Sequence, residues 1–260
     1  MWNALGTQFC LELAFGVLFA LAFVPKAPVG ALFYRVMGTT ALAPVLIALA
    51  GPLYAGERTW SDPVVLAAGL AVVTYPVYSG PVRGRPWAVA LGLALCGTAL
   101  AVVLSLPEAA AEQGSPPFAL AAASALATGA VAGSVGLAMV LGHWYLTVPN
   151  LAVKHLQRLN RVTVLSMAAS LVLVAATCFA FREVLEGAER PLFGPTGLFY
   201  LGTRLAVGLV LPLVFAAMTA SSLRYANTRS ATGILYASTV LVLIGTAVSV
   251  SLQDTYGLPL

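Results

Sequence analysis

Apolar residues run in long, nearly unbroken segments along this chain, and short clusters of Gly, Pro and charged residues separate those segments. A helix that crosses a lipid bilayer needs about 20 predominantly apolar residues. The pattern therefore predicts eight transmembrane helices joined by short loops. Their predicted ranges are 5–24, 31–55, 63–79, 87–106, 118–148, 160–181, 196–223 and 230–252.

The composition agrees with this interpretation. The 260 residues are 60% hydrophobic and 8% charged, with a mean hydropathy of +0.94, whereas a soluble domain carries about 25% charged residues. Too few charges remain to cover a water-facing surface, so most of the exterior is expected to face lipid. The predicted fold class is all-α: a polytopic integral membrane protein with a bundle of about eight transmembrane helices, forming one domain over residues 1–260.

Charged residues alternate between the two faces of the predicted bundle. One face has nine basic residues and no acidic ones: Lys26, Arg35, Arg83, Arg85, Lys154, Arg158, Arg161, Arg224 and Arg229. The other has three basic and eight acidic residues: Arg58, Arg182, Arg190, Glu57, Asp62, Glu108, Glu112, Glu183, Glu186, Glu189 and Asp254. Because cytoplasmic loops are rich in Lys and Arg, we expect a bacterial inner (cytoplasmic) membrane protein with both termini outside the cytoplasm. The net charge of +4 reflects this orientation and does not indicate nucleic-acid binding.

The chain leaves its first and fifth predicted helices through similar sequences. Residues 23–38 read FVPKAPVGALFYRVMG, and residues 147–162 read TVPNLAVKHLQRLNRV. In both, Val-Pro is followed after eight or nine residues by an arginine at the start of the next helix. Duplication would make residues 1–117 and 118–260 two parallel four-helix repeats. Convergence of two short basic loops is the alternative.

Two ionisable residues lie inside predicted spans, Glu12 in the first helix and Arg204 in the seventh. A charge in the membrane interior costs about 2.5–3.5 kcal/mol on insertion scales, so it usually has a partner or a function. At 1.5 Å per residue, both lie roughly 10–12 Å below the outer end of their helices. Equal depth and opposite sign predict that the two side chains pair.

Polar neighbours extend this pair into a candidate ligand site. Gln8 lies four residues before Glu12 and Tyr200 four before Arg204, the spacing that places residues on one helical face, and Thr203 is adjacent to Arg204. An amide, a carboxylate, a guanidinium and a phenol are suited to the head group and the protons of a quinone. The alternatives are a substrate path, a purely structural bridge between two helices, and two side chains that reach separately toward the interface.

Residues 141–161, LGHWYLTVPNLAVKHLQRLNR, are predicted to form the most distinctive loop, on the basic face. Aromatic residues are common at the membrane interface, and clustered Lys and Arg residues attract anionic lipids. The loop is therefore a candidate docking surface for anionic lipid or a cytoplasmic partner protein, although orientation alone also accounts for its cations. Its docking residues are His143, Trp144, Tyr145, Lys154, His155, Arg158 and Arg161.

Histidine and cysteine are too sparse for the common metal and haem sites. The two histidines, His143 and His155, lie twelve residues apart around one predicted loop, and the three cysteines are far apart without a CxxC motif. The chain also lacks HExxH and GxSxG motifs. We therefore expect no metal and no haem, and a non-catalytic subunit rather than an enzyme.

Glycine and proline suggest how two of the helices pack. The Gly129-xxx-Gly133 spacing in the fifth predicted helix allows close approach of another helix. Gly208 and Pro212 in the seventh predict a bend just below Arg204. Both features are compatible with packing alone, and the bend is also compatible with a cavity beside Arg204.

Three functional hypotheses follow. In helix number alone, the chain is similar to the eight-helix, haem-free membrane anchors that interact with quinones. The first hypothesis rests on the short loops and the polar cluster inside the membrane: an integral membrane subunit of a multi-protein respiratory or electron-transfer complex, with a quinone or quinol site near the outer side. The second is a transporter of a small solute or ion. The third is a structural membrane anchor that binds its protein partners and no ligand.

Overall fold

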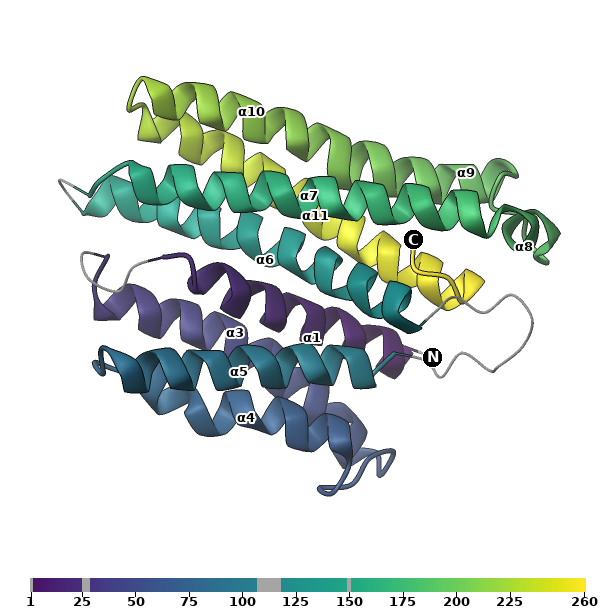
Figure 1. Cartoon of the computed structure of the whole chain (residues 1–260), viewed down its shortest axis with the longest axis horizontal. Coiled ribbons are helices and arrows are strands. Elements are labelled where there is room, and N and C mark those ends of the chain that lie inside the picture. The colour runs from purple at the N-terminus through teal and green to yellow at the C-terminus, as the bar shows by residue number, and fades with distance from the viewer. Residues whose placement is uncertain (1, 25–28, 107–117, 149–150) are drawn as a thin grey trace.

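The computed structural model describes residues 2–24, 29–106, 118–148 and 151–260, and within these ranges it contains helices and no strand (Figure 1). The helices are α1 (Trp2–Leu21), α3 (Ala31–Tyr54), α4 (Pro63–Tyr78), α5 (Arg85–Leu104), α6 (Phe118–Thr147), α7 (Lys154–Ala180), α8 (Arg182–Gly187), α9 (Pro195–Gly202), η1 (Thr203–Val210), α10 (Leu211–Arg224) and α11 (Thr228–Tyr256). The segment η1 is a π-helix that joins α9 to α10 without a break.

Six helices in the described ranges are long and apolar enough to cross a membrane: α3, α5, α6, α7, the continuous α9–η1–α10 helix and α11. The apolar parts of α1 (Leu5–Leu21) and α4 (Pro63–Tyr78) are shorter. The prediction of an all-helical fold is thus confirmed for the described residues, and the six apolar helices suggest a membrane-embedded protein. The count of eight spans stays a prediction, because it depends on α1 and α4.

The helices lie side by side, and their connections alternate between the two ends of the bundle (Figure 1). We call one end the basic end, because its described charged residues are all cationic: Arg35, Arg83, Arg85, Lys154, Arg158, Arg161, Arg224 and Arg229. The opposite, acidic end has six described acidic residues and three arginines: Glu57, Asp62, Glu183, Glu186, Glu189, Asp254, Arg58, Arg182 and Arg190. Lys26, Glu108 and Glu112 lie outside the described residues.

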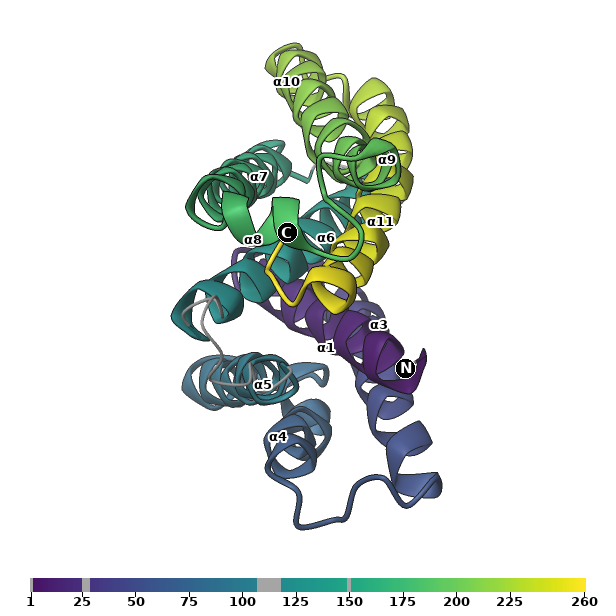
Figure 2. The same cartoon turned by 90° about the vertical axis from the view of Figure 1, so that its right-hand side faces the viewer.

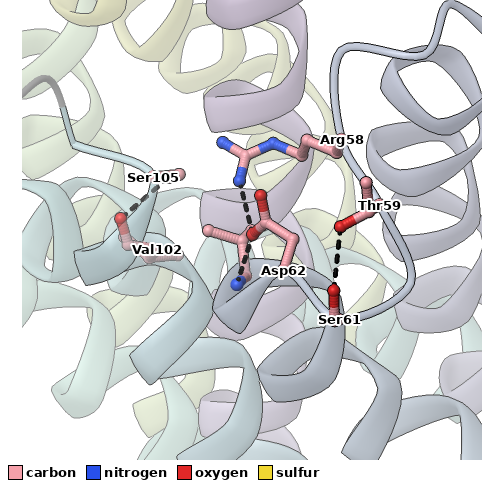
Figure 3. A network of polar contacts seen from close by, with 7 residues as sticks. Arg58, Thr59, Ser61, Asp62, Val102 and Ser105 are labelled. Carbon is pink, nitrogen blue, oxygen red and sulfur yellow. Dashed lines mark hydrogen bonds and ion pairs between the residues drawn. The ribbon is translucent and has the colours of Figure 1, made fainter.

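Arginines at the acidic end are paired locally. Arg58 donates to Asp62 Oδ1 at 2.8 Å, and the same oxygen accepts the backbone N–H of Val64 at 2.8 Å, which caps the start of α4 (Figure 3). Arg182 donates to Glu186 at 2.7 Å. Each pair cancels one arginine against one carboxylate, so the net charge of the acidic end stays negative.

The helices form two sets of four with the same pattern of neighbours. In the first set, α1 and α4 each pack against α3 and α5; in the second, α6 and α10 each pack against α7 and α11. Figure 2 looks along the helices and places the first set below the second, with α1 and α6 meeting between them. This arrangement agrees with the division at residues 117 and 118, while duplication of the chain stays a prediction.

Glycines bring α1 and α6 into backbone contact. A Cβ added to Gly133 would lie 1.8 Å from the carbonyl carbon of Gly16, and one added to Gly129 would lie 2.5 Å from the carbonyl oxygen of Glu12. No larger side chain fits at such distances. The close approach expected from the Gly129-xxx-Gly133 spacing is therefore confirmed, and the contact fixes Glu12 beside Gly129.

The prediction that residues 141–161 form a loop is wrong, chiefly because the helix after it begins earlier than predicted. The helix α6 continues to Thr147 and α7 begins at Lys154 rather than at residue 160. The first turns of α7 are helical because their residues divide between two faces: Lys154 and Arg158 are exposed or partly exposed, whereas Leu156 and Leu159 are fully buried. An amphipathic helix start was mistaken for a polar loop.

Candidate functional site

Glu12 lies on α1 and is 1% exposed. Its Oε1 accepts a hydrogen bond from Gln8 Nε2 at 3.0 Å, and the same amide nitrogen donates to Gln253 Oε1 on α11 at 3.0 Å. Among the described residues, Glu12 Oε2 has no hydrogen-bond partner. Gln8 is thus beside Glu12 as expected, and Gln253 is an additional residue because α11 extends to Tyr256, beyond its predicted end at residue 252.

Arg204 lies at the start of η1 and is fully buried. Its Nη2 donates to Thr128 Oγ1 on α6 at 3.0 Å and to Ser170 Oγ on α7 at 2.9 Å. Its Nη1 points to the carbonyl oxygen of Gly245 on α11 at 3.5 Å. All these acceptors are uncharged, and Nε has no partner among the described residues. Three neighbouring helices therefore hold the guanidinium without neutralising it.

The expected direct ion pair between Glu12 and Arg204 is not formed. Within the described ranges, nitrogen–oxygen ion pairs of 4.0 Å or less join Arg58 to Asp62 and Arg182 to Glu186 only. The helix α6 explains the separation, because the Glu12 backbone packs on Gly129 while Arg204 binds the adjacent Thr128. The two charges lie at one level of α6 and act on each other electrostatically without contact.

We call these residues the Glu12–Arg204 cluster. It comprises Gln8, Glu12, Thr128, Ser170, Arg204 and Gln253. Its members come from α1, α6, α7, η1 and α11. The cluster therefore joins the two sets of four helices at their common seam.

The helix that carries Arg204 widens into a π-helix at that residue rather than simply bending. Residues 203–210 form the π-helix η1, and such wide segments are rare and frequent at functional sites. Pro212 has no N–H to donate to the carbonyl of Gly208, which removes one ordinary α-helical bond. Gly208 also packs against Gly245, because a Cβ added to Gly208 would lie 2.6 Å from the Gly245 Cα.

Tyr200 and Thr203 do not join Arg204, contrary to the sequence interpretation. Tyr200 is 42% exposed and its ring contacts Phe199. The Thr203 hydroxyl donates to the Phe199 carbonyl at 2.8 Å, within its own helix. In the described structure, neither side chain hydrogen-bonds to Arg204. The four-residue spacing places side chains on one face only in a regular α-helix, and η1 begins between Tyr200 and Arg204.

The expected docking residues at the basic end have two different roles. Trp144 Nε1 donates to the Val29 carbonyl at 3.1 Å, and the Tyr145 hydroxyl donates to the Ala152 carbonyl at 2.5 Å. These two aromatic residues thus brace the connections around α6. His155 is 7% exposed, so its interpretation as a docking residue is wrong; it lies on the buried face of α7.

Of the expected docking residues, His143 and three cations of α7 are accessible. His143 Nδ1 is 3.3 Å from the Tyr236 hydroxyl oxygen on α11. Lys154, Arg158 and Arg161, which we call the α7 cations, lie along the accessible face of α7. That face continues toward the acidic end with exposed apolar residues, beginning at Leu165. Contact of the α7 cations with anionic lipid or a partner stays a prediction.

Neither a metal-binding group nor a known family accounts for the cluster. In the part of the chain that the structure describes, no three His, Cys, Asp or Glu side chains come together to hold a metal ion. No protein-family model, curated protein or solved structure matches the chain. The basis for a function is therefore the geometry of the cluster itself.

Proposed function

We propose that this chain is the integral membrane subunit of a multi-protein electron-transfer complex, and that the Glu12–Arg204 cluster binds the head group of a quinone or quinol. The observation that carries this proposal is a pair of unused polar atoms, Glu12 Oε2 and Arg204 Nε, both buried and without a partner among the described residues. An unpaired buried polar group costs about 1–3 kcal/mol, and more when it is charged. A bound ligand that pairs with these atoms removes that cost.

The chemistry of a quinone matches these two atoms. A quinone carbonyl accepts a hydrogen bond, which suits the guanidinium N–H, and a quinol hydroxyl donates one, which suits a carboxylate oxygen. Quinones dissolve in the bilayer, so they reach a site between membrane helices without entering water. The aromatic head group and the apolar tail also agree with a small polar cluster set among apolar helices.

The size of the connections supports the proposed role of a complex subunit. The described connections between helices are short, and the longest of them, residues 181–194, contains only the six-residue helix α8. Such connections leave no room for a domain that holds a redox cofactor. In this proposal, electrons exchanged with a quinone at the cluster pass to or from a partner subunit.

A transporter of a small solute or ion is the second candidate, and one observation favours it. The chain packs as two similarly arranged sets of helices, and the π-helix η1 carries a buried charge inside the second set. Transporters are often built from two such repeats. Substrate uptake by vesicles that contain the purified protein, with no requirement for a redox partner, would favour this candidate.

The quinone site is tested by binding of defined quinones to the purified protein in lipid nanodiscs. Ubiquinone-2 and menaquinone-4 are supplied, and the quinone retained after washing is extracted and quantified. We expect Glu12→Gln and Arg204→Met to reduce retention at least tenfold. The matched controls, Glu183→Gln and Arg190→Met, change exposed residues at the acidic end and should retain quinone as the wild type does.

Two other results would reject the proposal. If the wild-type protein retains neither quinone, a structural anchor and a transporter are the remaining candidate functions. Retention that is equal in the wild type and both cluster variants would place the quinone elsewhere. Mild-detergent extraction followed by mass spectrometry tests the complex separately, because recovery of this chain alone would remove the role of a subunit.

A further inference from the structure

Polar side chains connect Glu12 to the acidic end of the bundle. Gln8, one helical turn along α1, links Glu12 Oε1 to Gln253 through two hydrogen bonds of 3.0 Å. Gln253 is 9% exposed and lies in the last turn of α11, beside the exposed Asp254. The hydrogen bonds thus end at Gln253, one residue before the exposed Asp254.

Toward the basic end, the rest of α1 and the neighbouring part of α6 are almost entirely apolar. Residues 13–24, LAFGVLFALAFV, contain no polar side chain. On α6, the residues from 129 to 142 include one hydroxyl, that of Ser134, which donates to the Val131 carbonyl in its own helix at 3.2 Å. Leu18 and Leu137 are almost fully buried in this region. These segments offer no group that carries a proton inward.

The charged residue that the structure places at the level of Glu12 is Arg204. The helices packed against α1 are α3, α5, α6 and α11. Arg204 lies across α6 at the level of Glu12, because it binds Thr128 while the Glu12 backbone packs on Gly129. Among the described residues, no cation lies within 4.0 Å of the Glu12 carboxylate.

We propose that Glu12 binds and releases a proton in exchange with water at the acidic end of the bundle, and not with water at the basic end. Gln8 and Gln253 act as positioning residues: they hold Oε1, which leaves Oε2 as the oxygen that gains and loses the proton. This inference rests on the proposed quinone site, because it names the side to which a proton from a bound quinol goes. The proton leaves the quinol hydroxyl, binds Oε2, and passes to water near Asp254.

The test is chemical labelling of Glu12 in sealed vesicles with different pH on the two sides. Dicyclohexylcarbodiimide enters the bilayer and adds to protonated carboxyl groups, and mass spectrometry of the peptide that contains Glu12 quantifies the product. An impermeant amine reagent on Lys154, which lies at the basic end, establishes the orientation of the protein. Glu12→Gln controls for the site of labelling.

We expect the wild-type labelling yield to increase by up to about tenfold for each unit by which the pH at the acidic end is lowered. The yield should not depend on the pH at the basic end. Gln8→Leu and Gln253→Leu should weaken this dependence at least threefold, whereas the matched control Ser134→Ala should preserve it. Labelling that follows the pH at the basic end, follows neither side or is absent would overturn the inference. The wild-type comparison alone decides this, so a variant that fails to fold does not affect it.

The same vesicles separate this inference from the proposed quinone site. If the protein retains no quinone but Glu12 labelling still depends on the pH at the acidic end alone, only the choice of ligand is wrong. Conversely, quinone retention with labelling that follows the basic end would keep the site and reverse its sidedness. Each failure therefore has its own readout.

Discussion

Removing the hydroxyl of Ser170 should destabilise the protein only while Arg204 is present. Ser170 Oγ accepts from Arg204 Nη2 at 2.9 Å, and both side chains are almost completely buried. Hydrogen bonds to charged groups contribute about 1.5–3 kcal/mol, whereas side-chain hydrogen bonds between membrane helices average about 0.6 kcal/mol. The charge of Arg204 has no counter-ion in contact among the described residues, so we expect the upper range to apply.

The measurement is a double-mutant cycle with Ser170→Ala and Arg204→Met. The free energy of unfolding is determined in mixed micelles by titration with a denaturing detergent. We expect Ser170→Ala to cost about 1.5–3 kcal/mol in the wild type and about 0.5 kcal/mol or less in the Arg204→Met background, which gives a coupling energy of about 1–2.5 kcal/mol. The control is Thr98→Ala, because the buried Thr98 hydroxyl bonds to the Ala94 carbonyl within its own helix at 2.9 Å.

The result that would refute this reasoning is additivity. If Ser170→Ala costs the same in both backgrounds to within about 0.3 kcal/mol, the hydroxyl does not stabilise the guanidinium and Arg204 is held by other groups. Coupling of similar size between Thr98→Ala and Arg204→Met would instead indicate a general weakening of the protein. Only coupling confined to Ser170 supports the geometry of the cluster.

Two further predictions concern the helix seam and the basic end. Gly133→Leu should destabilise the protein by about 3 kcal/mol or more, at the upper end of overpacking costs, because its Cβ would lie 1.8 Å from the Gly16 backbone. The control is Gly136→Leu, because a Cβ at Gly136 meets nothing within 4 Å. Equal melting temperatures of the two variants in thermal unfolding would contradict the packing. Replacing the three α7 cations by Gln should reduce phosphatidylglycerol retention measured by native mass spectrometry, since each cation near an anionic surface contributes about 1 kcal/mol. The control replaces Arg83 and Arg85, and an equal loss there would show that total charge matters rather than the α7 face.

The helices were predictable from the sequence because a bilayer sets both their length and their composition. Six of the predicted segments correspond to helices that are long and apolar enough to span a membrane. The ends were harder to place where an apolar helix continues as an amphipathic one. At the start of α7, accessible cations alternate with buried residues such as Leu156 and Leu159, and average polarity over such a segment resembles that of a loop.

The charged residues of the site were also predictable, but their partners were not. Glu12 and Arg204 stand out because charges are rare in apolar segments. Thr128 and Ser170 do not, since hydroxyls are frequent in membrane helices and commonly bond to their own backbone, as Ser134 does. Which hydroxyl faces Arg204 depends on how distant helices pack. The error at Tyr200 has a local cause, the π-helix, which a spacing rule for α-helices does not include.

The separation of Glu12 from Arg204 favours a binding site over a structural bridge. A contact ion pair would let the guanidinium and the carboxylate satisfy each other, and removal of one partner would leave the other exposed to the full cost of burial. Here α6 separates the two side chains, which lie at the same level of the bundle. Their opposite charges still reduce the free-energy cost of burying each charge. Glu12 Oε2 and Arg204 Nε nevertheless each lack a hydrogen-bond partner among the described residues. A bridge has no need of unused positions, whereas a ligand that accepts at one atom and exchanges a proton at the other requires both.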